Sequence, residues 1–227
     1  MARTFNGSSQ YLSASSTLLT NEPIDMVIHG KSNSTTAGQF AISLGNNGAN
    51  GGIAFAFRGD VASDPLQAWK FDDTSAGGSG VTSTGFSAST WYVGSSTFIS
   101  NTSRSVFLNG ASKGSDTTNA PDPTPDFITL GALRRSTLSL YFDGSLAEAY
   151  ILDVNMTDAN HAVCGKGYSP LWIVPIKNVR AWYPLQRHNS NNVRNGYPAE
   201  LTATGSPTTS SHPFNVVYPR IGALITC

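Results

Sequence analysis

Carboxylates are the side chains of this sequence best suited to chemistry, and glutamate is scarce among them. Three glutamates occur, Glu22, Glu148 and Glu200, and they are far apart in the chain. A retaining glycosidase needs two carboxyl groups about 5 Å apart, which alternate positions of one strand can supply because every second side chain points the same way. No such pair of glutamates can be placed, so the sequence argues against this chemistry.

Aspartate pairs do not replace the missing glutamates. Asp72 and Asp73 follow one another in a turn-rich segment, and Asp122 and Asp126 stand in the proline-rich segment 119–127. Carboxylates in such loops are usually solvated, so they are not expected to act as acid and base.

Nucleophiles and metal ligands give no better candidate. Cys164 follows His161 closely, but no third group that would orient the histidine is evident, so a packing role is favoured. The histidines lack the paired spacing of zinc sites; they are His29, His161, His188 and His212. The chain is therefore predicted not to be an enzyme.

Binding residues are easier to propose. Trp69 precedes Asp72 and Asp73, and an exposed aromatic ring beside loop carboxylates could hold a sugar. Calcium accepts loose sets of loop oxygens, so Asp60, Asp64 and Asp116 are weak calcium candidates. Solvated turns explain the same three aspartates, and no other cofactor is implied.

Composition restricts the partners. The chain has 227 residues, a formal net charge of zero and only 12% charged residues, with the basic ones scattered. Nucleic acid is therefore not an expected partner. No apolar run resembles a signal peptide or a membrane span, which predicts synthesis and folding in a cytoplasm without secretion, no membrane contact, and free thiols at Cys164 and Cys227.

Short alternating apolar segments predict strands at 51–60, 89–100, 104–114 and 138–152. Asn109-Gly110 and Asp143-Gly144 each predict a two-residue hairpin turn, because these residues tolerate positive φ. The best helical candidate is a short one near 156–167. These elements predict two packed antiparallel sheets.

The predicted Asp143-Gly144 hairpin places Glu148. It would pair Phe142 with Ser145 and Leu140 with Ala147 on a core face. Glu148 and Tyr150 would then lie on the opposite, mixed face. A structural role is favoured for Glu148.

Three blocks resemble successive strands of the laminin G-like, concanavalin A-like jelly roll: "FNGSSQYLS", "STWYVGSSTFISNTSRSVFLNGASKGSDT" and "ITLGALRRSTLSLYFDGSLAEAYILDVNMTDA". The resemblance covers residues 1–160 and implies a jelly-roll sandwich of two antiparallel sheets, completed by residues 161–227 and a tail within one structural domain. The Glu-x-Asp-x-x-Glu run of glucanases with this fold is absent. "IDMVIHGKS" lacks a tryptophan that members often carry, and Tyr92-Val93 stands where a His-His pair often occurs, so no sugar or calcium site is carried over.

The segment "GKGYSPLWIVPIKNVRAWYPLQ" with "LTATGSPTTSSHP" is similar to C-terminal segments of laminin G-like proteins of tailed phages and prophages. This similarity implies a non-enzymatic virion protein, most simply a capsid decoration or a head- or tail-fibre component. It would contact capsid or other virion proteins as a homo-oligomer, with Ile221, Leu224 and Ile225 as interface candidates. The alternative is a carbohydrate-binding adhesion module on the virion surface, using Trp69 and binding surface glycans, with or without calcium.

Overall fold

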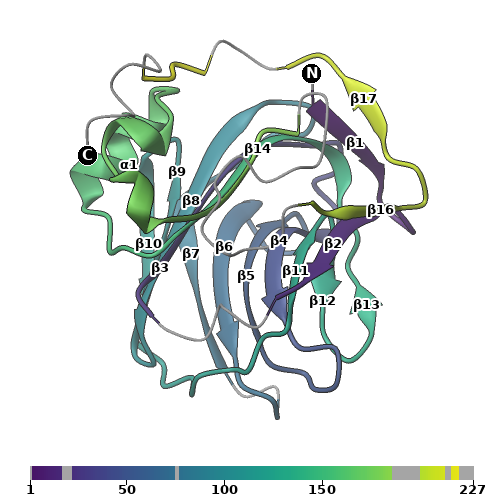
Figure 1. Ribbon diagram of the computed structural model, residues 1–227, viewed down its shortest axis with the longest axis horizontal. Coiled ribbons are helices and arrows are strands. Elements are labelled where there is room, and N and C mark those ends of the chain that lie inside the picture. The colour runs from purple at the N-terminus through teal and green to yellow at the C-terminus, as the bar shows by residue number, and fades with distance from the viewer. Residues whose placement is uncertain (1, 17–21, 75–76, 186–199, 213–215, 220–227) are drawn as a thin grey trace.

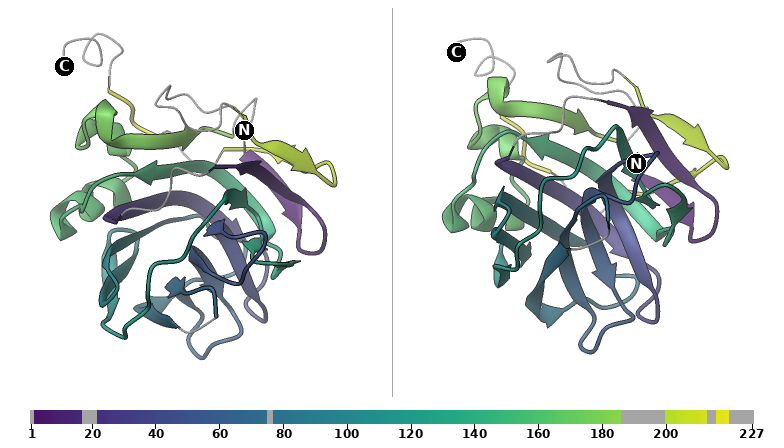
Figure 2. Two further views of the ribbon diagram at one scale, coloured as in Figure 1. Left: turned by 60° about the horizontal axis from the view of Figure 1, so that its bottom comes forward. Right: turned by 90° about the horizontal axis from the view of Figure 1, so that it is seen from below.

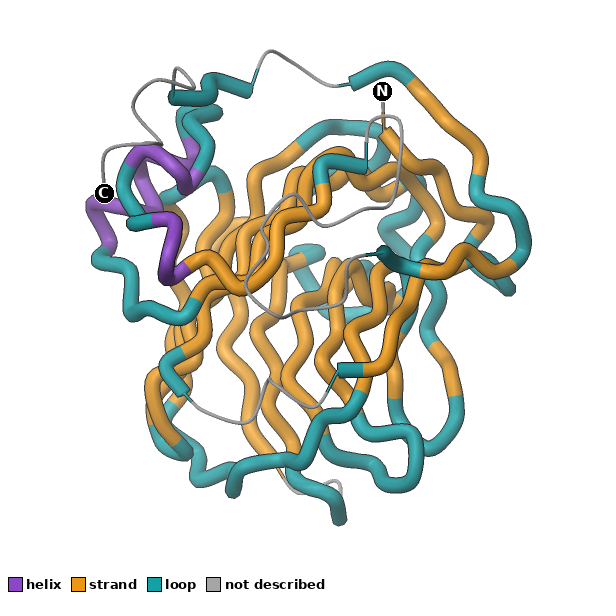
Figure 3. Tube along the Cα trace, in the orientation of Figure 1, coloured by secondary structure: helices purple, strands orange, loops and turns teal. Residues whose placement is uncertain are grey.

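The structure is a computed structural model that describes residues 2–16, 22–74, 77–185, 200–212 and 216–219. Strands dominate it and form two antiparallel sheets that pack face to face (Figure 1). Figure 2 shows both layers from other sides, and Figure 3 shows the helical turns gathered in one region of the molecule. The predicted all-β sandwich of two antiparallel sheets is confirmed.

Sheet A contains eight strands, which are β1 (Ala2–Asn6), β3 (Ile24–Ser32), β8 (Tyr92–Ser100), β9 (Ser103–Leu108), β10 (Ala111–Asp116), β14 (Asp143–Leu152), β15 (Val179–Tyr183) and β17 (Thr208–Ser210). Their order is β10-β9-β8-β3-β14-β1-β17, and β15 also pairs with β14. The central strands are therefore β3 and β14, which are distant in sequence.

Sheet B contains seven strands, which are β2 (Tyr11–Ser15), β4 (Gly38–Gly45), β5 (Gly52–Arg58), β6 (Pro65–Phe71), β7 (Gly77–Gly85), β11 (Phe127–Leu130) and β16 (Thr202–Thr204). Their order is β16-β2-β11-β4-β5-β6-β7. A small separate sheet pairs β12 (Leu133–Arg134) with β13 (Leu138–Ser139).

Alternation along β5 shows how the sequence fills both sides of sheet B. Ile53, Phe55 and Phe57 point between the sheets and join the main hydrophobic core. Ala54 and Ala56 point outward and join a smaller cluster on the outer face. A strand with large residues on one face and alanines on the other packs against sheet A and leaves room for neighbouring side chains outside.

Helical turns lie on the outer face of sheet A. They are α1 (Asp158–Gly165) and two short 3-10 helices, η1 (Pro170–Trp172) and η2 (Ile176–Asn178). Thr157 begins α1 by accepting a hydrogen bond from the Asn160 backbone, as an N-cap residue does. The predicted short helix is confirmed. No helix within the described ranges is long and apolar enough to cross a membrane.

The two predicted hairpins have opposite outcomes. Asn109 and Gly110 have φ of 51° and 68° and join β9 to β10, as predicted. Asp143-Gly144 forms no hairpin turn, because these two residues begin β14. Gly144 lies opposite Phe5 on β1 and opposite Ser32 on β3. A Cβ on Gly144 would lie 2.0 Å from the Lys31 carbonyl oxygen, so this glycine permits the close approach of two strands.

The predicted pairs around this turn are therefore wrong. Leu140 does not enter the core; it is 46% exposed and has φ of 49°. A register shift between Leu146 and Glu148 places Leu146 in the main core and leaves Glu148 on the outer face of sheet A. The bulge reverses the alternation that uninterrupted counting would give.

The C-terminal third adds strands to both sheets. β15 pairs with β14, β16 pairs with β2 of sheet B, and β17 pairs with β1 of sheet A. The predicted interface residues Ile221, Leu224 and Ile225 lie outside the described residues. Their role stays a prediction.

Candidate functional site

Trp69 lies on the outer face of sheet B, where β6 places it beside Ala54 of β5 and Ser79 of β7. The indole is half-buried, with its ring centroid 5.7 Å from that of Phe40 and 4.7 Å from that of Phe71. Both phenylalanines are fully buried. The small alanine side chains of β5 let these three rings meet, and the contacts fix the orientation of the indole.

Polar groups adjoin the indole on the same face. Gln67 precedes Trp69 by two residues and lies opposite Ala56 and Val81, of which Val81 is 40% exposed. Arg58 donates hydrogen bonds to the Gln67 side-chain oxygen and to Asp60. We call Arg58, Gln67, Trp69, Ser79 and Val81 the Trp69 face.

The charge on the Trp69 face is balanced. Arg58 Nε lies 2.7 Å from Asp60 Oδ1, and this hydrogen bond lowers the pKa of Asp60 below its usual value. The Arg58 side chain is 21% exposed and that of Asp60 is 41% exposed. A guanidinium held by two acceptors keeps a fixed direction, so its remaining N–H groups can meet a ligand without reordering.

The small β12–β13 sheet covers part of the outer face of sheet B. Leu133 is buried in the cluster that contains Phe40, Phe71 and Trp69. The Arg135 guanidinium lies 5.4 Å from the centre of the Phe71 ring. These contacts bury the phenylalanines, while Trp69 and Val81 keep exposed surface.

Asp72 and Asp73 lie in the turn after β6. Asp72 accepts hydrogen bonds from the backbone and hydroxyl of Thr74, at 2.9 and 2.8 Å. Asp73 accepts one from the Thr124 hydroxyl at 3.0 Å. These bonds hold the aspartates at the loop end of the strand, whereas Trp69 lies on the sheet face.

Two of the three calcium candidates have carboxylates paired with arginines. Asp60 pairs with Arg58 and Asp116 with Arg104. Asp64 lies in a turn with φ of 47°, where its carbonyl accepts the Phe86 backbone N–H. Within the part of the chain that the structure describes, no three His, Cys, Asp or Glu residues group closely enough to hold a metal ion.

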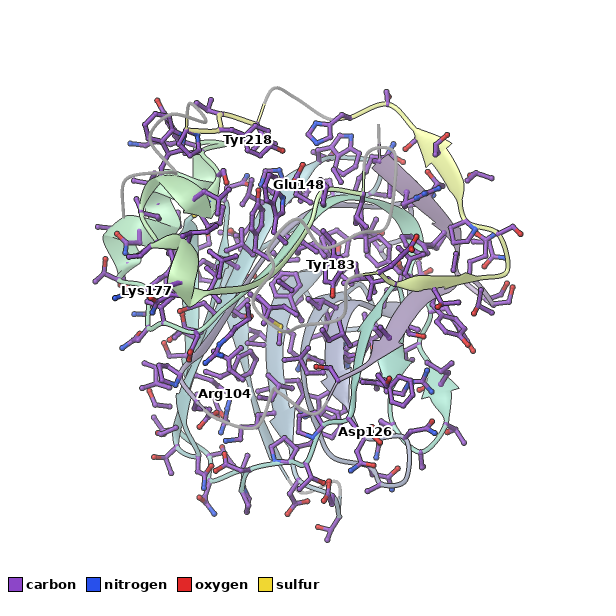
Figure 4. The ribbon with its side chains drawn as sticks, in the orientation of Figure 1. Arg104, Asp126, Glu148, Lys177, Tyr183 and Tyr218 are labelled. Carbon is purple, nitrogen blue, oxygen red and sulfur yellow. The ribbon has the colours of Figure 1, made fainter. Side chains whose placement is uncertain are left out.

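A buried lysine was not anticipated from the sequence. The Lys70 side chain is fully buried, and its Nζ lies 2.8 Å from Glu22, 2.7 Å from Asn101 and 2.8 Å from Asp122. Arg104, labelled in Figure 4, is also fully buried and donates to the carbonyl of Asn101. A single lysine in a mostly apolar strand gives no sequence signal for such a network.

Glu148 is fully buried on the outer face of sheet A. It accepts hydrogen bonds from Trp182 Nε1 at 2.6 Å, from the Tyr150 hydroxyl at 3.1 Å and from the Tyr218 hydroxyl, and Figure 4 shows Tyr218 beside it. His212 Nε2 lies 3.7 Å away. Burial raises the pKa of both tyrosines, so they remain donors. These contacts are consistent with the structural role predicted for Glu148, which stays a prediction.

His161 occupies a second buried polar site on the outer face of sheet A. Its Nδ1 lies 2.8 Å from the Ser95 hydroxyl and its Nε2 lies 2.9 Å from the Thr97 hydroxyl. Asp25 accepts from Thr97 and from the Met156 backbone. Burial lowers the pKa of His161 to about 4 and raises that of Asp25 to about 7.

The other cysteine and tryptophan predictions divide. Cys164 is a free, buried thiol whose pKa burial raises to about 12, which suits the predicted packing role. Trp182 and Trp91 are half-buried, and neither belongs to the main core. Trp172 is 49% exposed and is the last residue of η1. It lies in no strand, so the strand pattern of the sequence did not mark it as a binding residue.

No protein-family model matches the sequence, and no curated protein matches it. Solved structures do resemble the fold. Among them is a heptameric pentraxin from Limulus polyphemus, with a TM-score of 0.60 and 11% identity over 72% of this chain and 81% of the other.

Two further similar structures are domains named with their sugars. Domain 4 of an extracellular arabinanase from Geobacillus stearothermophilus, in complex with arabinotriose, has a TM-score of 0.59 and 20% identity over 72% of this chain and 76% of the other. The CBM40 of a Ruminococcus gnavus IT-sialidase, bound to α2,3-sialyllactose, has a TM-score of 0.58 and 14% identity over 72% and 96%. With the sheet topology described above, these likenesses identify the fold as a concanavalin A-like jelly-roll sandwich.

Proposed function

We propose that this chain is a carbohydrate-binding module that acts without catalysis, with the Trp69 face as its contact surface. One observation carries the proposal: Trp69 is held by Phe40 and Phe71 on an outer sheet face that also carries Gln67 and the partly exposed guanidinium of Arg58. The rest of the outer aromatic cluster is buried.

Sugar rings match such a surface chemically. Each ring has C–H groups on its faces, which can lie against an aromatic ring, and hydroxyls around its edge, which need donors and acceptors. The same face supplies the partly exposed guanidinium of Arg58, which donates to the buried Gln67 side chain. A rigid aromatic side chain with a few fixed polar groups is the usual composition of a small-ligand site.

The similar structures support this class of ligand. Two carbohydrate complexes, with arabinotriose and with α2,3-sialyllactose, occur among domains of this fold. Because fold alone does not determine function, the likeness supports the proposal but does not replace the argument from the Trp69 face.

Binding without catalysis is supported by the state of the carboxylates. Glu148 is fully buried and accepts hydrogen bonds from three side chains, and Asp60 and Asp116 are paired with arginines. A glycosidase needs a carboxylic acid and a second carboxylate that both reach the substrate. Turnover of a polysaccharide by the purified chain, lost in an alanine variant of one carboxylate, would contradict this part of the proposal.

The test is a glycan array that includes arabinotriose and α2,3-sialyllactose, read with and without calcium. We expect Trp69→Ala to weaken the strongest signal about tenfold, because stacked aromatic contact is worth roughly 1.4 kcal/mol. Trp91→Ala is the matched control, since Trp91 is also half-buried but lies immediately before β8, away from the Trp69 face. Equal signals from the Trp69→Ala variant and the unmodified chain would overturn the Trp69 face as the site.

The virion role implied by the C-terminal segment is a second candidate. Residues of that segment form β15, β16 and β17, which extend both sheets. Strands at a sheet edge are a common place for pairing with other subunits. Saturable binding of the purified chain to particles stripped of accessory proteins, with a silent glycan array, would favour it. Homo-oligomerisation and contact with capsid proteins belong to this candidate.

A further inference from the structure

A second aromatic surface lies on the other side of the sandwich from Trp69. Six large hydrophobic residues of the described chain are exposed, and three of them meet here: Tyr168, Trp172 and Val217, which are 40%, 49% and 40% exposed. The Tyr168 and Trp172 ring centroids are 6.2 Å apart, with the rings at 85°. We call these three residues the Trp172 corner.

Backbone contacts hold the Trp172 corner in place. Trp172 Nε1 donates to the Val217 carbonyl at 2.9 Å, and the same carbonyl accepts the Ser169 backbone N–H at 2.9 Å. The Val217 N–H in turn donates to the carbonyl of Gly167 at 3.0 Å. Two segments about fifty residues apart in the chain are thus joined to present exposed rings, so little ordering would be needed on binding.

The surface beneath the corner explains why the rings face solvent. Leu171 and Val174 are buried in the cluster on the outer face of sheet A, together with Tyr150. Pro170 begins η1 and the Ser169 hydroxyl accepts the Leu171 N–H at 3.2 Å. With Leu171 turned inward on this short helix, the adjacent Trp172 side chain must point away from the sheet.

Size favours a saccharide over a protein as the occupant. The exposed parts of the three side chains amount to roughly 200–300 Å², given the area of aromatic side chains. A stable protein interface needs about 800 Å² on each partner, so the corner falls well short of it. One or two sugar rings fit this area, and the similar domains that bind arabinotriose and α2,3-sialyllactose show that this fold can take such ligands.

We propose that the Trp172 corner is a second saccharide contact, which makes the chain bivalent toward glycans. The inference rests on the proposed function and extends it. Among the described residues, the Tyr168 hydroxyl has no hydrogen-bond partner and can meet a sugar hydroxyl beside the indole face. The two contacts lie on the outer sides of different sheets, so one polymer segment can occupy each.

The test uses beads coated with arabinotriose, with α2,3-sialyllactose or with the strongest glycan of the array. The unmodified chain should be captured on beads and should also aggregate them. Trp172→Ala should still be captured through Trp69, but bead aggregation should fall at least tenfold. Ile99→Ala, at a residue 39% exposed on β8, is the control and should aggregate beads normally.

The outcomes separate the two proposals. Capture of the unmodified chain with undiminished aggregation by Trp172→Ala would overturn the second contact and leave the proposed function standing. No capture of the unmodified chain on any bead would overturn both. Loss of capture only in the double variant with Trp69→Ala would confirm two independent contacts, provided that its thermal unfolding matches that of the unmodified chain.

Discussion

The outer faces of the two sheets carry similar residues in opposite states. On sheet A, the Trp182 indole donates a hydrogen bond to Glu148, and the centroids of the Trp182 and Tyr218 rings are 5.5 Å apart. On sheet B, the Trp69 indole is supported by Phe40 and Phe71 and keeps exposed surface. The two tryptophans differ in exposure because different segments cover the two faces. Tyr218 of the C-terminal segment packs over sheet A, whereas β12 and β13 cover only part of sheet B.

This comparison shows why residue type alone does not assign function here. Glu148 has three hydrogen-bond donors and no exposed surface, so its chemistry is used within the fold. Arg58 and Gln67 bind each other at a partly exposed position. The covered face should therefore respond to substitution in stability, and the open face in ligand affinity.

The largest effect is expected for Glu148→Ala on the covered face. It would leave the Trp182 indole and two tyrosine hydroxyls without their acceptor, which should cost about 3–5 kcal/mol of unfolding free energy in urea denaturation. Glu148→Gln, which keeps an acceptor oxygen, is the control and should lose less. A stable Glu148→Ala protein without glycan binding would reverse the roles of the two faces.

Acid sensitivity should also belong to the covered face. Burial lowers the pKa of His161 to about 4, so the folded state binds this proton more weakly than the unfolded chain does. The contribution of His161 to the unfolding free energy should therefore fall as the pH drops from about 6.5 to 4. In His161→Gln that loss should shrink by about 3 kcal/mol, measured by urea denaturation across pH. An unchanged pH profile would contradict the burial of a neutral imidazole.

Asp25 should act in the opposite direction. Burial raises its pKa to about 7, so the folded state favours the protonated carboxyl and loses stability as the pH rises from about 4 to 7. Asp25→Asn mimics the neutral form and should be more stable than the unmodified chain at pH 8, by up to about 4 kcal/mol. At pH 4 the advantage should vanish; a variant less stable at both pH values would show that the ionised form is preferred.

The smallest change in stability is expected for Arg58→Ala on the open face. Its pair with Asp60 is partly exposed, so the unfolding free energy should change by less than about 1 kcal/mol. Glycan affinity should nevertheless fall about fivefold, because a fixed donor of the Trp69 face is lost. Lys113→Ala removes the exposed pair with Asp158 and is the matched control. Equal affinity in both variants would exclude Arg58 from the site.

Local signals in the sequence predicted much of the fold. The alternation in residues 51–60 and the Asn109-Gly110 turn were sufficient for β5 and the β9–β10 hairpin. The hairpin predicted at Asp143-Gly144 is wrong because Gly144 allows β14 to approach β3 closely, and these strands are over a hundred residues apart in sequence. The bulge before Glu148 likewise depends on a long-range partner strand.

The site was less predictable than the fold. Trp69 stands out as an aromatic residue in a strand, but its supports, Phe40 and Phe71, become neighbours only through the β4–β5–β6 register. Trp172 is exposed because its neighbour Leu171 packs in the cluster on the outer face of sheet A and because the Val217 carbonyl of the C-terminal segment accepts a hydrogen bond from its indole. Spacing in the sequence carries neither fact.

The most direct test compares two tryptophans, one on each face. Glycan affinity and unfolding free energy would be measured side by side for Trp69→Ala and Trp182→Ala. We expect Trp69→Ala to lose about tenfold in affinity with the smaller loss of stability, and Trp182→Ala to keep its affinity with the larger loss of stability. Retained binding in Trp69→Ala together with lost binding in a folded Trp182→Ala protein would contradict the assignment of binding to the open face.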